Sequence, residues 1–183
     1  MHIEAAQREV RRVYAGGFPG LLISAGVWIV AAALGTWVGW QAAMWALVVG
    51  GAFIFFALEV LLRAVGHNPA LSAENPLNAL TLQLAFLLPL LLPLIVAAFQ
   101  HRDDWLFPAF MIALGAHFLP FTFLFGMWQF GALGMVMGLS GMVFGFATTE
   151  SFVIAGWYGG AVQLLFAFMA LSAIRREQGG ARA

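Results

Sequence analysis

The chain has 183 residues, of which 63% are hydrophobic and 9% are charged, whereas about 25% are charged in an ordinary soluble domain. Its 8 basic and 8 acidic side chains give no net formal charge. This balance excludes a soluble globular domain, a disordered chain and an electrostatic nucleic-acid-binding protein. The absence of cysteine excludes disulfides and thiolate chemistry. The composition is typical of an all-α polytopic membrane protein.

The segment 1–16 is expected to form a short amphipathic helix in the membrane interface. Ile3, Ala6, Val10 and Val13 recur at helical spacing. Such a helix lies in the headgroup layer, where a topology anchor is the simpler interpretation. Lipid sensing and docking of a partner are the alternatives.

Six segments are apolar enough to cross a membrane, which needs about 20 apolar residues. They predict a single six-helix transmembrane domain at 17–175, followed by a short cytoplasmic tail at 176–183. In chain order, the expected spans are Phe18–Trp37, Ala43–Val65, Leu77–Phe99, Trp105–Phe125, Phe130–Ala155 and Gly159–Ile174.

The arginines predict the orientation of these spans. With six spans, only Arg102 falls on one side of the membrane. Cytoplasmic loops carry the excess of basic residues, so both termini are expected in the cytoplasm. All basic residues are arginine, which suggests a GC-rich bacterial genome and hence a bacterial inner membrane. The other side carries Arg8, Arg11, Arg12, Arg63, Arg175, Arg176 and Arg182.

The two halves of the chain, 18–100 and 105–175, resemble each other. Gly50 and Glu59 in the second span match Gly141 and Glu150 in the fifth. Repeats with an odd number of spans are inverted, which is a plan common in transporters. Chance matches in apolar sequence give similar patterns, so both interpretations stay open.

Five polar side chains within or near the spans are the candidates for binding a substrate or a proton. Ionisable groups in a membrane are costly and often functional. Glu59 has the alternative of an ion pair with Arg63, and His117 and the glutamines have the alternative of a structural role in packing. The candidates are Glu59, His117, Glu150, Gln83 and Gln163.

Prolines and glycines mark two further features of the spans. Pro89, Pro93 and Pro120 remove backbone hydrogen bonds and predict kinks, with free carbonyls beside a cavity as one outcome. Glycines at helical spacing in the fifth span predict close helix packing, within the bundle or across a dimer. These glycines are Gly134, Gly138, Gly141 and Gly145.

Two short motifs resemble known membrane families. Gly138-Leu139-Ser140-Gly141 resembles the serine motif of rhomboid proteases, but Trp157 stands where that family has histidine. A serine without a base is not activated, and His117 is the one candidate on another span. Asn68-Pro69-Ala70 resembles the aquaporin triplet, without the second triplet that aquaporins need.

The sequence therefore favours a channel or transporter for a small solute or ion, with proton coupling through Glu59, His117 or Glu150. The first alternative is a non-catalytic membrane subunit or scaffold that packs against a partner or lipid. The second is an intramembrane enzyme acting on lipid, with Ser140 and His117 as the candidate pair. We expect no cofactor, no metal and no nucleic acid. The expected partners are the lipid bilayer and either further copies of the chain or another membrane protein.

Overall fold

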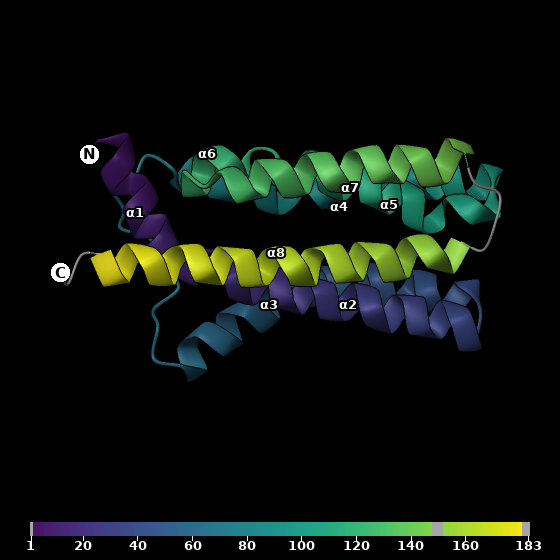
Figure 1. Cartoon of the computed structure of the whole chain (residues 1–183), viewed down its shortest axis with the longest axis horizontal. Helices are drawn as coiled ribbons and strands as arrows, with labels where there is room; N and C mark the ends of the chain where they lie inside the picture. The colour runs from purple at the N-terminus through teal and green to yellow at the C-terminus, as the bar shows by residue number, and fades with distance from the viewer. Residues whose placement is uncertain (1, 148–151, 181–183) are drawn as a thin grey trace.

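A computed structural model describes residues 2–147 and 152–180, and these residues form a bundle of α-helices (Figure 1). Six of its segments are long and apolar enough to span a membrane, so the expected all-α six-helix bundle is confirmed. In chain order, the elements are α1 (Ile3–Val13), η1 (Ala15–Gly17), α2 (Phe18–Trp37), α3 (Trp40–Ala64), α4 (Asn78–His101), η2 (Asp103–Trp105), α5 (Leu106–Phe118), α6 (Phe121–Phe125), α7 (Trp128–Ala147) and α8 (Phe152–Gly180).

The first span has the bounds that the sequence predicts, but the last two do not. α7 begins at Trp128, and its described end is Ala147. The expected fifth span, Phe130–Ala155, is wrong because 152–155 already belong to α8. The sixth span is correspondingly longer than Gly159–Ile174 at both ends. Continuous apolar sequence on both sides of 148–151 hides this boundary from a hydropathy argument.

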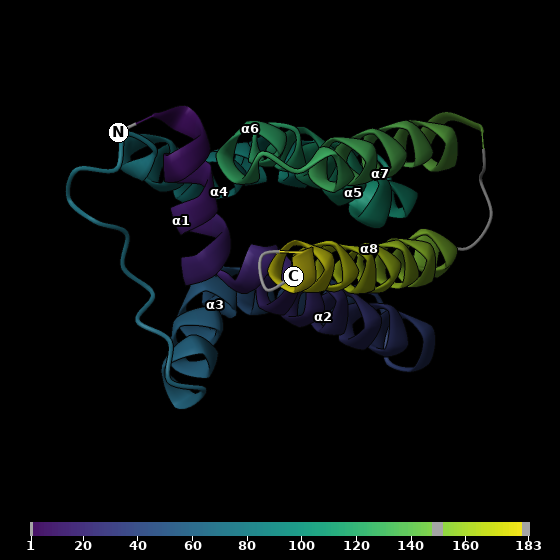
Figure 2. The same cartoon turned by 60° about the vertical axis from the view of Figure 1, so that its left-hand side comes forward.

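The spanning helices form two layers, which Figures 1 and 2 show from two directions. One layer holds α4, α5, α6 and α7, and the other holds α2, α3 and α8. Both termini lie at the same end of the bundle. Within the layers, α2 packs against α3 and α8, while α5 packs against α7 and α4. The first span of each half, α2 or α5, therefore packs against the next span of its own half and against the last span of the other half.

Glycines allow the closest helix contacts within each layer. A Cβ atom on Gly115 of α5 would lie 2.6 Å from the backbone nitrogen of Gly138 on α7. In the other layer, a Cβ atom on Gly159 of α8 would lie 2.5 Å from the Trp28 ring of α2. Each layer is therefore held by close packing that larger side chains would prevent.

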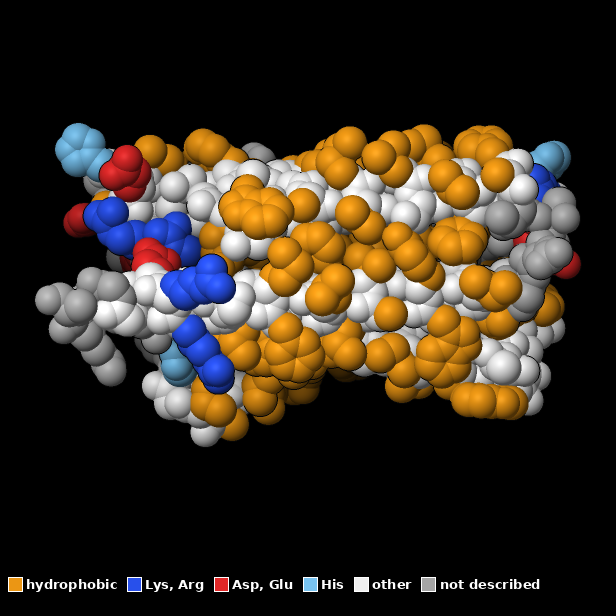
Figure 3. Space-filling model, viewed as in Figure 1, with side chains coloured by type: hydrophobic (Ala, Val, Ile, Leu, Met, Phe, Trp, Pro, Cys, Tyr) orange, Lys and Arg blue, Asp and Glu red, His pale blue; other side chains and the backbone are white. Residues whose placement is uncertain are grey.

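The outside of the bundle is apolar over most of its length (Figure 3). Aromatic and aliphatic side chains such as Phe56, Leu90 and Phe146 are exposed, at 64%, 73% and 74%. In water such a surface would aggregate, whereas in a bilayer it faces lipid chains. Charged side chains gather at the two ends of the view, most of them at the end that carries the termini.

α1 packs across this end of the bundle. Its apolar face buries Ala6 and Val10 completely. Gly16 and Gly17 adopt positive φ angles of 64° and 78°, which glycine tolerates without strain, and they turn the chain from α1 into α2. The amphipathic pattern expected at 1–16 thus forms a helix whose apolar face is covered by the bundle itself.

Candidate functional site

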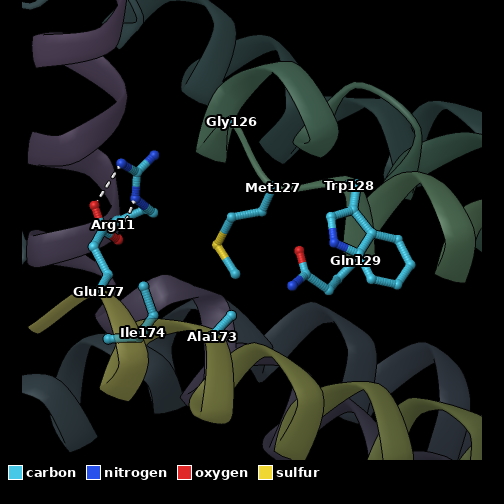
Figure 4. A pocket seen from close by; sticks show the side chains of 8 residues that line it. All are labelled: Arg11, Gly126, Met127, Trp128, Gln129, Ala173, Ile174 and Glu177. Atoms are coloured by element: carbon cyan, nitrogen blue, oxygen red, sulfur yellow. Dashed lines mark hydrogen bonds and ion pairs between the residues drawn. The ribbon is translucent and has the colours of Figure 1, made fainter. Parts of the chain in front are cut away.

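The candidate site is a pocket of about 250 Å³ beneath α1, at the junction of the two layers (Figure 4). α1 contributes Arg11, the start of α7 and the turn before it contribute one wall, and the end of α8 contributes the other. The lining residues are Arg11, Gly126, Met127, Trp128, Gln129, Ala173, Ile174 and Glu177.

An ion pair between Arg11 and Glu177 closes one side of the pocket. The Arg11 guanidinium donates from Nε to Glu177 Oε2 at 2.9 Å and from Nη2 to Oε1 at 2.8 Å. Its Nη1 donates to the carbonyl of Phe125, at the end of α6, at 2.6 Å. Because the Arg11 side chain is only 15% exposed, this bidentate pair is better shielded from water than an ordinary surface pair.

Further polar contacts fasten α1 to the layer that contains α4 and α6. Gln7 donates to the carbonyl of Phe123 at 2.5 Å. Glu9 accepts from the backbone N–H of Ser72 at 2.6 Å and from the Asn75 side chain at 2.9 Å. These hydrogen bonds hold the pKa of Glu9 below its ordinary value, and the one from the Ser72 backbone has the largest effect.

The walls of the pocket combine apolar and polar groups. Figure 4 shows Met127 and the Gln129 amide extending toward the space above α8, where Ala173 and Ile174 form an apolar floor. Trp128 is 65% exposed at the start of α7. The pocket therefore offers a carboxylate, an amide and a thioether to a small ligand.

Among the predicted candidates, Glu59 forms an ion pair with Arg63 at 2.5 Å, as the ion-pair alternative for this residue describes. Both side chains are at least half exposed. Gln83 is exposed, because α4 lies at the edge of the bundle, so the packing alternative for this side chain finds no buried interface there. Glu150 lies outside the described residues. Neither Glu59 nor Gln83 lines the pocket beneath α1.

His117 and Gln163 are buried, in different parts of the bundle. Nδ1 of His117 has no hydrogen-bond partner among the described residues, and the ring lies 4.9 Å from that of Phe121, centroid to centroid. Gln163 is fully buried, accepts a 2.5 Å hydrogen bond from Ser24 of α2 and donates to the carbonyl of Gly159. The structure gives Gln163 a packing role between α2 and α8.

The prolines differ in their effect on the helices. α4 stays helical through Pro89 and Pro93. At Pro120 the span is interrupted, since α5 ends at Phe118 and α6 begins at Phe121. The short α6 brings the carbonyls of Phe123 and Phe125 to Gln7 and Arg11 of α1.

The glycine series of α7 faces α5 within the bundle. Cβ atoms on Gly134, Gly141 and Gly145 would meet atoms of α5 or of Trp105 within 2.8–3.1 Å. A Cβ atom on Gly138 would meet nothing within 4 Å, although the Gly138 backbone is the surface that Gly115 approaches. The four glycines therefore differ in what a larger side chain would cost.

Ser140 lies at the junction of α7 and α8. Its hydroxyl forms a 2.9 Å hydrogen bond with the hydroxyl of Tyr158. The serine is therefore hydrogen-bonded to a phenol, whereas Nδ1 of His117 has no hydrogen-bond partner among the described residues. Among the described residues, no hydrogen bond joins Ser140 to His117, the candidate pair of the enzyme alternative.

Arg11, Gln129 and Glu177 were not predicted as site residues from the sequence. Arg11 was an orientation signal there, and Glu177 belonged to the expected tail. Arg11 and Glu177 are 166 positions apart in the sequence, so they form no local motif. The one signal in the sequence was the carboxylate of Glu177 just after the last apolar segment, together with the basic amphipathic segment 1–16 at the other end of the chain.

The chain matches one family model over residues 3–173, a range that includes α1 and ends before Glu177. No curated protein and no solved structure matches the chain. Because the match covers most of the sequence, the chain belongs to DUF7010, a family of unknown function.

Proposed function

We propose that this protein carries a small solute or ion across the membrane along the junction of its two helix layers. The pocket beneath α1 is one opening of this route. The observation that carries the proposal is the position of this pocket: it lies on the junction, at the end of the bundle, and is lined by polar and apolar groups together.

The geometry of the bundle supports this proposal. Contacts of α8 with α5 and α7 join the two layers along this junction. Ser140 and Tyr158 place a pair of hydroxyl groups on the same junction, between α7 and α8. A polar pocket followed by polar groups on the same junction is the arrangement that a solute path requires.

In the proposed orientation, the pocket opens to the cytoplasm of a bacterial cell. The end that carries the termini holds the arginines of α1, of the end of α3 and of the end of α8. Arg102 follows α4 at the opposite end. Positively charged segments remain in the cytoplasm during insertion. His117 and Glu150 are the proposed proton-responsive groups, with Glu59 as a third.

Flux through purified protein in liposomes tests the proposal. The vesicles enclose a pH-sensitive dye, and methylammonium, acetate or sodium gradients are imposed as probes. We expect an ion-dependent signal that Glu177→Gln reduces at least tenfold and that Asp104→Asn, which removes an ion-pairing carboxylate at the opposite end, leaves unchanged. No flux above empty vesicles with any probe would refute transport of these ions. Unchanged flux in His117→Ala and Glu150→Gln would refute the proton sites.

A second candidate function is that of a membrane subunit that packs against a partner. It is favoured by the exposure of α3 and α4. In the most apolar stretch of each helix only 11% and 17% of the residues are buried, against 61% in the span that contains α5. Native mass spectrometry of the protein released from its own membrane tests it. A stoichiometric second polypeptide would support the subunit, whereas a monomer or homo-oligomer would oppose it.

A further inference from the structure

We infer that the pocket beneath α1 is a binding site for a small organic cation of the guanidinium or alkylammonium type, which the protein's own Arg11 occupies in this structure. The inference rests on the proposed function for its role, since it names the class of solute that the route takes. It follows from the hydrogen-bond acceptors around the Arg11 guanidinium and from the pocket beside them.

The surroundings of Arg11 form a complete site for a planar cation. Both oxygens of Glu177 accept from it in the two-pronged geometry that carboxylates offer to guanidinium groups, and the carbonyl of Phe125 accepts from the third nitrogen. These acceptors come from α8 and α6, in different layers. Only the donor comes from α1.

The space beside this ion pair is open and suits a cation with a short apolar body. The pocket of about 250 Å³ borders both Arg11 and Glu177. Met127, Ala173 and Ile174 supply apolar and polarizable contacts, and the Gln129 carbonyl oxygen is a further acceptor (Figure 4). Glu177 is 46% exposed, so a soluble cation reaches this carboxylate without crossing the core.

A cation that binds Glu177 competes with Arg11 and therefore loosens α1. The same helix covers the pocket, and it keeps Val10 completely buried against the bundle. Occupation by the ligand is thus linked to the lifting of α1, and α1 acts as an internal competitor that keeps the site closed when the ligand is scarce.

The absence of cysteine from the chain allows a direct test of this linkage. In a Val10→Cys variant the single thiol reports on α1, and its rate of reaction with a water-soluble maleimide is measured in detergent. We expect millimolar methylguanidinium chloride to raise this rate about tenfold and equal sodium chloride to leave it unchanged. An unchanged rate with methylguanidinium, or an equal rise with sodium chloride, would overturn the inference.

Two variants in the Val10→Cys background distinguish binding of the cation to Glu177 from a general weakening of the Arg11–Glu177 ion pair. Arg11→Gln and Glu177→Gln both break the pair, so both should react rapidly without ligand. Only Arg11→Gln should still bind methylguanidinium, because it keeps the carboxylate. Asp104→Asn, which affects an ion pair at the opposite end, should respond as the parent does.

A second measurement, on chains that keep Val10, guards against misfolding of the cysteine variant. Methylguanidinium should raise the apparent melting temperature of the wild-type protein and of Arg11→Gln, since a ligand stabilises the state that it binds. It should not raise that of Glu177→Gln, and a rise there would overturn the assignment. Binding without flux refutes the proposed function alone, whereas flux without binding refutes this inference alone.

Discussion

The contact between α5 and α7 makes a quantitative prediction about two glycines. A Cβ atom on Gly115 would lie 2.6 Å from the nitrogen of Gly138, 2.7 Å from the oxygen of Gly134 and 2.8 Å from the Cα of Gly138. All three are backbone atoms, which cannot rotate away. Ordinary contacts between carbon atoms are about 3.5–4.0 Å long, so Gly115→Ala must push the helices apart by roughly 1 Å.

The magnitude follows from two opposing terms. Overpacking costs about 1–3 kcal/mol, and replacing glycine by alanine within a helix returns up to about 1 kcal/mol. Because all three clashing atoms belong to the backbone, we take the upper overpacking cost, and Gly115→Ala should lower the free energy of unfolding by about 2 kcal/mol. For a protein of this size that corresponds to a fall in apparent melting temperature of about 4–8 °C.

Gly138→Ala is the matched control, because it lies on the same helix interface and in the predicted glycine series. A Cβ atom there meets nothing within 4 Å, so the substitution should be neutral or stabilising by up to about 1 kcal/mol. Both variants are compared by thermal unfolding in detergent, followed by circular dichroism. A loss in Gly138→Ala equal to that in Gly115→Ala, or no loss in Gly115→Ala, would refute the close contact.

Three other predictions concern single polar groups. The pKa of Glu9 is lowered in the folded protein, so the stabilising effect of this carboxylate is present above the ordinary value of 4.5 and is lost as the pH falls through the lowered value. The melting temperatures of the wild type and of Glu9→Gln should therefore converge in acid. A constant difference between them would contradict this prediction. Ser24→Ala leaves the buried side-chain oxygen of Gln163 without its 2.5 Å hydrogen-bond partner and should lower the free energy of unfolding by about 1–2 kcal/mol. The double variant Ser24→Ala with Gln163→Leu should lose less stability. Equal losses in the two variants would refute the pairing. A cysteine at His67, in the exposed loop at the end with the termini, should resist an impermeant thiol reagent in intact cells and react in inverted vesicles; the reverse pattern would place the termini outside.

The number of spans and most of their bounds could be predicted from the sequence, because hydropathy over about 20 residues reports membrane burial directly. The span at Phe18–Trp37 has Pro19 in its first turn and ends near Gly39, so local signals agree with hydropathy there. Between α7 and α8 they disagree. The apolar stretches on either side are long, and the polar run at 148–151 is short.

The candidate site could not be predicted, because it is made by tertiary structure. A search for ionisable residues inside the spans led to Glu59 and His117, which the structure places in an exposed ion pair and in a buried aromatic cluster. The pocket uses residues just outside or at the ends of spans. Arg11 and Glu177 meet only because α1 folds back over the end of the bundle.

α1 determines how the two layers are joined at this end. It bonds to α6 and to the segment before α4 in one layer, and to α8 in the other. Its hydrogen bonds at this end exchange with solvent at small net cost, and its apolar face completely buries two side chains, Ala6 and Val10. The glycine contacts within each layer are apolar and closely packed, so separating them costs far more. A movement that opens the pocket at low cost must therefore break the Arg11–Glu177 pair and leave each layer intact.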